Sequence, residues 1–344
     1  MLELLRSSLN RRQPNLPPLT EKQWEDVYWL SRKHGVVTMI NDVIEAMPDE
    51  LRPHSDIALS WALSAERTRY HYARQEAVLD KLRTKASEQG FQMVLLKGMT
   101  LSKLFPVPSS RACGDIDIYF PGNYEKGNEL LGMPNAEMIG KHSETAIDGV
   151  TVENHLNFLD LNYQSQQLAE QYITDSLGQV SPDGELPPMA NMVYLLMHTV
   201  SHLTAKIKLP LRNVVDWGLF LYSYRDQLPP EECHKVLKSI RMDDAFNILT
   251  HLASEFIGQD LSGFISGKVR KNDATKLRSM ILNKSYMEKR PKESNVLKYF
   301  ALRYSRNRQR RWLYRYLPSS ASERVSLTLN QIFHKASLPN KDET

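Results

Sequence analysis

The segment DIDIYF, residues 115–120, alternates polar and apolar side chains with a period of two. This alternation predicts a half-buried β-strand whose apolar side chains face a core. Asp115 and Asp117 would point together from the opposite face. Two carboxylates so close repel each other unless a cation lies between them, and Mg²⁺ prefers such oxygen ligands. A lone Asp-x-Asp is more often a solvated strand face or a turn, but the apolar Ile116, Ile118 and Phe120 favour a packed strand that carries a metal site.

A second feature lies upstream, where the apolar run Phe91–Leu96 predicts a buried strand. Lys97-Gly98 follows it and precedes a short expected helix, Met99–Phe105. Glycine lets the backbone approach a ligand closely, and amides at a helix start can hold phosphate oxygens. Lys97 and Arg111 could neutralise phosphate charge. Taken alone, the Lys-Gly step fits a surface lysine before a helix better.

Downstream of the two aspartates, the dipeptide Asp148-Gly149 is typical of a tight hairpin turn. Glu153 follows on the second hairpin strand and shares one strand face with His155 by the same period-two argument. Glu153 is the preferred third carboxylate of the metal site, and Asp148 and Asp160 remain alternatives. The further expected strands are Glu137–His142, Thr145–Ile147 and Val150–Phe158.

The sequence on both sides of the sheet has helical character. Residues 1–19 are expected to form a polar arm, and Thr20 with Gln23 predicts a capping box at the first helix. The expected fold class is α/β (α+β), a small mixed-sheet core with helices on one side and helical regions before and after it. The expected helices are Thr38–Ala46, Ser55–Glu88, Tyr124–Leu131, Met189–His202, Leu211–Tyr224, Glu231–Ile240 and Asp243–Ile257. The expected regions are helical 1–88, the sheet core 89–162, a helical region lining a cleft at 163–260, and a basic helical region with a tail at 261–344.

Composition excludes several classes of protein. The net charge of the 344 residues is +4, too small to argue for nucleic-acid binding by itself. Cys113 and Cys233 form neither a zinc cluster nor a disulfide framework, which favours a reducing compartment. The first residues do not resemble a signal peptide, and no stretch approaches the about 20 apolar residues that span a membrane. We therefore expect a soluble cytoplasmic protein.

These motifs together resemble a bacterial family of nucleotidyltransferases in the DNA polymerase beta-like superfamily, whose members commonly lie among polysaccharide-biosynthesis genes. The resemblance covers roughly residues 20–225 and includes Leu-Lys-Gly, an arginine before Asp-x-Asp, and an acid-x-His step. It departs from the pattern in two places: Lys-Gly replaces the superfamily's usual Gly-Ser, and the third acid is Glu. The matching residues are Leu95–Gly98, Leu101, Leu104, Arg111, Asp115–Ile118, Glu153–His155, His198, His202, Arg212 and Asp216.

The resemblance implies transfer of a nucleoside monophosphate from a nucleoside triphosphate such as ATP to a hydroxyl group, with release of pyrophosphate. Asp115, Asp117 and Glu153 would hold two Mg²⁺ ions, with Mn²⁺ as an alternative metal. Lys97, Gly98 and Arg111 would hold the phosphates. The acceptor would be a sugar or polysaccharide precursor, a protein or an RNA. The rival interpretations are a toxin of a toxin–antitoxin pair and a catalytically inactive nucleotide-binding module.

Two helical pairs and one basic segment are secondary candidates. His198 and His202, four residues apart, predict a buried pair or a polar wall of the cleft. Arg212 and Asp216 have the same spacing, and an ion pair within one helix is the first expectation. Both pairs line the cleft if the resemblance holds. Residues 303–316 interleave arginines with aromatic side chains, which suits contact with RNA or a membrane surface, or equally a helix packed on the body.

Overall fold

A four-stranded mixed sheet lies near the middle of the chain. The structure is a computed structural model, and it describes residues 1–344 except 139, 204–208, 284–310, 317–322 and 324–344. The strand order is β1-β2-β4-β3; β2 and β4 run parallel, and the other two pairs are antiparallel. The strands are β1 (Val94–Leu95), β2 (Asp115–Tyr119), β3 (His142–Ile147) and β4 (Val150–His155).

Helices precede, interrupt and follow this sheet, which confirms the predicted fold class. The longest is α4, whose 34 residues lack both Gly and Pro and therefore favour a continuous helix. The capping box at Thr20 is also confirmed, because Thr20 Oγ1 accepts from the Gln23 amide and the Gln23 side chain accepts from the Thr20 amide. The α-helices are α1 (Leu2–Leu9), α2 (Glu21–His34), α3 (Val37–Ala46), α4 (Ser55–Glu88), α5 (Met99–Ser102), α6 (Tyr124–Leu130), α7 (Gln164–Asp175), α8 (Pro188–Ser201), α9 (Leu211–Ser223), α10 (Pro230–Ser239), α11 (Asp243–Ile257) and α12 (Lys271–Leu282).

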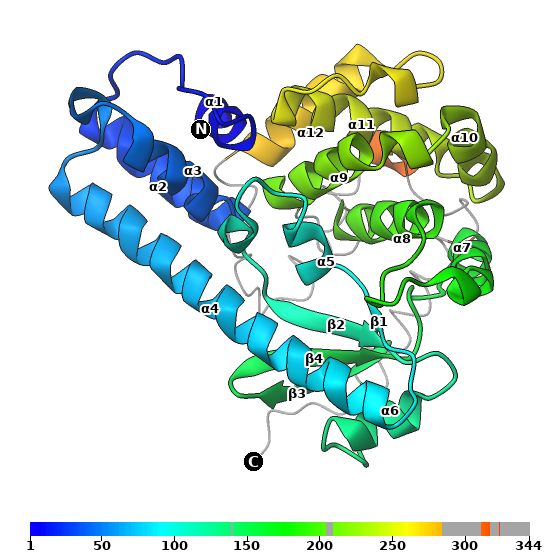
Figure 1. Ribbon diagram of the computed structural model, residues 1–344. Helices are drawn as coiled ribbons and strands as arrows, with labels where there is room; N and C mark the ends of the chain where they lie inside the picture. Colours follow the sequence, from blue (N-terminus) through cyan, green and yellow to red (C-terminus); the bar gives the residue numbers. More distant parts are fainter. Residues whose placement is uncertain (139, 204–208, 284–310, 317–322, 324–344) are drawn as a thin grey trace, which may run out of the picture.

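The two faces of the sheet have different neighbours. Ile116 and Ile118 of β2 are buried against α4, with Val78, Leu79 and Leu82 in the same hydrophobic cluster. Figure 1 shows α4 crossing this side of the sheet, with α5 and α8 on the other side. The polar side chains of β2 therefore face away from α4. This arrangement leaves one sheet face available for a site.

A larger hydrophobic core joins the N-terminal helices to the later ones. It includes Trp24 of α2, Met39 of α3, Tyr194 of α8, Trp217 of α9 and Phe256 of α11. Helix α1 packs against α3 and α11, and α9 packs against α11. Helices α8 and α9 are thus held by this larger core on the side of the sheet that carries the acids.

Two local predictions were wrong. Residues 1–19 are not an arm throughout, because Leu2–Leu9 form α1 and bury Leu4 and Leu5 completely. Their leucine spacing gives a helix an apolar stripe that packs on α3 and α11. The expected strand Glu137–His142 is absent from the described part of that range, since 137, 138, 140 and 141 are not in a strand and β3 begins only at His142 and continues to Ile147.

The basic and aromatic segment lies partly outside the described residues, since 303–310 are not described. Within it, Arg311–Tyr316 form a 3₁₀ helix. The Tyr316 hydroxyl donates to Asp273 of α12 at 2.8 Å, and Trp312 packs beside Tyr316 against the main core. These two aromatic side chains therefore serve packing. Among the described helices, none combines the length and the hydropathy that crossing a bilayer requires.

Candidate active site

Three carboxylates meet on the sheet face opposite α4. Asp115 and Asp117 lie two residues apart on β2, and the parallel pairing places Glu153 of β4 directly beside Asp117. One carboxylate oxygen from each residue lies within 4.8 Å of the others. Asp117 is fully buried, and the other two side chains are partly exposed. The structure thus brings together the three acids that the sequence singled out.

The two alternative acids, Asp148 and Asp160, do not belong to this cluster. Asp148 occupies the exposed hairpin turn, where its carboxylate pairs with Lys81 of α4 at 2.6 Å. Asp160 lines the cleft beside the acids but does not belong to the three-carboxylate cluster. Among the described residues, Glu153 is therefore the third member of that cluster.

The surroundings shift the pKa values of Asp115 and Asp117 in opposite directions. Burial raises the pKa of Asp115, and the negative charge of Asp117 raises it further. Burial alone would also raise the pKa of Asp117, but Lys97 and His155 reverse that effect and hold it well below its usual range. The Lys97 ammonium lies 2.7 Å from Asp117 Oδ1, and His155 Nε2 lies 3.0 Å from the same oxygen. Asp117 is therefore ionised, with its negative charge balanced by Lys97 and His155. The ionised form of Asp115 is disfavoured by repulsion from Asp117.

The Lys97-Gly98 step reaches the acids because β1 pairs with β2. Leu95 lies opposite Ile118, and the Leu96 amide donates to the Asp117 carbonyl at 3.0 Å. Gly98 has a φ of 70° at the residue before α5, a conformation that favours glycine. The sequence assigned Lys97 to phosphates but gave no sign of its contact with Asp117.

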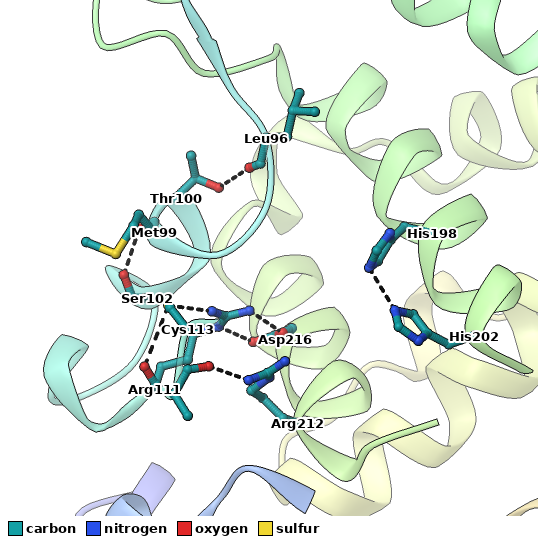
Figure 2. A network of polar contacts seen from close by, with 11 residues as sticks. Leu96, Met99, Thr100, Ser102, Arg111, Cys113, His198, His202, Arg212 and Asp216 are labelled. Carbon is teal, nitrogen blue, oxygen red and sulfur yellow. Dashed lines mark hydrogen bonds and ion pairs between the residues drawn. The ribbon is translucent and has the colours of Figure 1, made fainter. Parts of the chain in front are cut away.

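Arg111 and Asp216 form a buried ion pair between the segment before β2 and helix α9. Arg111 Nε and Nη2 donate to the two carboxylate oxygens of Asp216 at 2.7 Å each. The predicted ion pair between Arg212 and Asp216 was wrong, because Arg111 occupies both oxygens. Arg212 instead donates through Nη1 to the Ala112 carbonyl (Figure 2). Both arginines thus connect the segment before β2 to helix α9.

His198 and His202 contact each other across one turn of helix, with 3.1 Å between their Nε2 atoms (Figure 2). Burial lowers the pKa of His198 far below its usual value, and the nearby charge of Lys97 lowers it further. His198 is therefore a neutral imidazole, and both histidines line the cleft as a polar wall. The described geometry adds Lys141, which the sequence analysis did not single out, to the same cleft.

The cleft between the acids and helices α8 and α9 has a volume of about 470 Å³. A volume of this order suits a small-molecule ligand. The sequence-predicted residues that line it are Lys97, Gly98, Arg111, Asp115, Glu153, His155, His198, His202, Arg212 and Asp216. Asp117 lies beneath this lining, in contact with Lys97 and His155.

A small mixed sheet with clustered acids beside a cleft of this size is an arrangement suited to metal-dependent phosphoryl chemistry. A family model described as uncharacterised nucleotidyltransferase matches residues 20–258. The chain therefore belongs to this family of nucleotidyltransferases. Comparison with curated proteins gave no match, and neither did comparison with solved structures.

Proposed function

We propose that this nucleotidyltransferase moves a nucleoside monophosphate from a nucleoside triphosphate to a hydroxyl acceptor, with release of pyrophosphate. The observation that carries the proposal is the meeting of Asp115, Asp117 and Glu153 within 4.8 Å on two adjacent strands. The fold expected from the resemblance, a DNA polymerase beta-like core, needs three carboxylates gathered in this way on adjacent strands. Three acids in mutual reach favour catalysis over an inactive binding module.

The donor set suits Mg²⁺. All three side chains offer carboxylate oxygens, the ligands that Mg²⁺ prefers. Asp117 Oδ2 is buried and has no hydrogen-bond partner among the described residues, so it remains available as a ligand. Asp115, Asp117 and Glu153 would hold the metal, with Mn²⁺ as a substitute. Bound there, the metal supplies positive charge for the phosphates and lowers the cost of bringing them beside three acids.

The protein's own cations suit the remaining phosphate charge. Lys97 lies against Asp117 at the floor of the cleft, and Gly98 places the start of α5 next to it. Arg212 has no ion pair with an acid among the described residues, whereas the charge of Arg111 is already matched by Asp216. We propose that Lys97, the Gly98 backbone and Arg212 contact phosphate oxygens, and that Arg111 acts mainly by fixing α9 to the segment before β2.

The acceptor hydroxyl would enter beside helix α8. His198 is neutral and His202 is its hydrogen-bond partner, so this wall offers polar contacts to which His198 adds no positive charge. Sugar hydroxyl groups are suited to such contacts, which is consistent with the polysaccharide-gene association of the family that the sequence resembles. We propose a sugar or polysaccharide precursor as the acceptor; a protein or RNA acceptor is the other outcome to test.

The test uses the purified full chain, Mg²⁺, each α-labelled nucleoside triphosphate and panels of sugar, protein and RNA acceptors. We expect label transfer that chelation abolishes and that Asp115→Asn or Asp117→Asn lowers at least about 100-fold. Asp148→Asn is the matched control, because Asp148 pairs with Lys81 outside the cleft. Full transfer by both site variants would remove this function, and transfer to RNA or protein alone would replace the sugar acceptor.

A further inference from the structure

A second group of metal-binding side chains lies on the same sheet face, one strand further along. The β3–β4 pairing places His142 directly opposite His155, and Glu153 precedes His155 by two residues on β4. The two imidazole rings are 5.2 Å apart between centroids. All three side chains project from one face because strand residues two apart share a face, as do paired neighbours. This His–Glu–His group shares Glu153 with the acid cluster and adds two imidazole nitrogens, of which His155 Nε2 also lies 3.0 Å from Asp117 Oδ1.

The spacing of these three side chains matches that of ligands around one ion. Glu153 Oε2 lies 3.3 Å from His155 Nε2 and 3.6 Å from His142 Nδ1, and the three ligand atoms lie within 4.8 Å of one another. Bonds of about 2.0–2.1 Å in a tetrahedral zinc site put neighbouring ligand atoms about 3.3–3.4 Å apart. His142 Nδ1 is also buried and has no hydrogen-bond partner among the described residues.

We propose that His142, Glu153 and His155 form a site for a borderline transition-metal dication such as Zn²⁺, beside the all-oxygen site. Two imidazoles and one carboxylate favour such an ion, whereas Mg²⁺ and Ca²⁺ select oxygen ligands. The three protein ligands leave a coordination position open toward the cleft, which all three residues line.

Glu153 belongs to both groups, so the two sites share a ligand. An ion at the His–Glu–His group would lie next to the ion held by Asp115 and Asp117, and the two would be unlike in chemistry. Binding at this group needs no nucleotide and no turnover. The inference therefore stands or fails independently of the proposed nucleotidyl transfer.

Cobalt is the probe, because Co²⁺ replaces Zn²⁺ and its visible absorption is intense at low coordination number with nitrogen ligands. The chelator-treated full chain is titrated with Co²⁺ in excess Mg²⁺, which occupies oxygen-only sites. We expect one Co²⁺ per chain, displaced by Zn²⁺. His142→Ala, on a partly exposed edge strand, is expected to weaken binding at least about tenfold, as is His155→Gln.

Two variants serve as controls. His251→Ala removes an exposed histidine of α11 and is expected to bind Co²⁺ as the wild type does. Asp115→Asn changes only the all-oxygen group and is expected to keep Co²⁺ binding while losing nucleotidyl transfer. Circular dichroism of each variant checks that it is folded. Co²⁺ binding that survives both histidine variants, that Asp115→Asn alone abolishes, or that is absent from the wild type would overturn the proposal.

Discussion

The guanidinium of Arg111 forms a bidentate pair with the carboxylate of Asp216, through two hydrogen bonds of 2.7 Å from Nε and Nη2. Both side chains are more than nine-tenths buried. Arg111 also donates through Nη1 to Cys113 Sγ at 2.9 Å, so each of its three guanidinium nitrogens makes a hydrogen bond. The pair connects the segment that leads into β2 to helix α9, and both residues line the cleft beside the acids.

Removing one partner of this pair should destabilise the fold. We expect Asp216→Ala to lower the free energy of unfolding by about 3–5 kcal/mol, because it leaves the Arg111 charge buried without an anion. The double variant Arg111→Met with Asp216→Ala should lose less than the sum of the single changes Arg111→Met and Asp216→Ala. Urea unfolding of the four proteins measures this difference. Additive effects would mean that the two side chains do not act as a pair.

Asp115 should limit the stability of the metal-free protein. Burial and the charge of Asp117 both disfavour its ionised form. Asp115→Asn removes this repulsion, so we expect a gain of the order of 1 kcal/mol in the free energy of unfolding without metal. Added Mg²⁺ should stabilise the wild type and should have little effect on the variant. Thermal melts with and without Mg²⁺ check both statements, and a less stable metal-free variant would contradict the first.

Gly184 supports the outer edge of β1. Its carbonyl accepts from the Leu95 amide at 2.7 Å, and its φ is 80°. A Cβ there would lie inside the van der Waals distance of the Met93 carbonyl oxygen. We therefore expect Gly184→Ala to cost about 3 kcal/mol, the sum of backbone strain and overlap.

Gly132→Ala is the matched control for this change, because Gly132 has a similar φ of 78° and open space around it. It should cost only about 1 kcal/mol from the backbone conformation. Denaturant unfolding compares the two variants. Equal losses would show that the contact with Met93 contributes nothing.

His34 should make the protein less stable in mild acid. It is fully buried at the end of α2, and its Nδ1 accepts from the Leu211 amide of α9 at 3.0 Å. Burial lowers its pKa to about 4. In the unfolded chain His34 takes up a proton near pH 6.5, whereas in the folded chain its imidazole stays neutral. The free energy of unfolding present above pH 6.5 is therefore lost as the pH falls toward 4. From pH 7 to 5 this loss is about 2 kcal/mol.

His34→Asn provides the comparison, because its side-chain oxygen can accept from Leu211 and does not titrate. We expect the variant to lose about 2 kcal/mol less than the wild type between pH 7 and 5. Urea midpoints at both pH values give the result. Parallel losses in the two proteins would assign the acid sensitivity to other groups.

Most of the fold follows from local signals in the sequence. Helix α4 and the Asp148-Gly149 hairpin were predicted because residue composition and a two-residue turn determine them locally. Helix α1 was missed because its eight residues are short for an isolated helix and depend on packing against α3 and α11. Tertiary contacts, which one sequence does not reveal, decide such elements.

The part of the candidate site that could be predicted is the part that lies on strands, because strand alternation decides which side chains share a face. Alternation on β2 and β4 gave Asp115, Asp117 and Glu153 a common face. Counting back across the two-residue turn would also have paired His142 with His155. The partners of Lys97 and Asp216 could not be predicted, because each lies on a different element and is brought there only by packing.

Asp148 and Gly149 both have positive φ, 48° and 70°, as a tight two-residue turn requires. This turn fixes which residues of β3 and β4 lie opposite each other, and β4 in turn aligns with β2. A single-residue insertion between Val150 and Glu153 would turn Glu153 and His155 toward the apolar residues of α4. Homologous chains that keep this chemistry should therefore vary in length outside β4. In β4, deletion of one residue before Glu153 should abolish the site, whereas deletion of two should keep Glu153 and His155 on the same face.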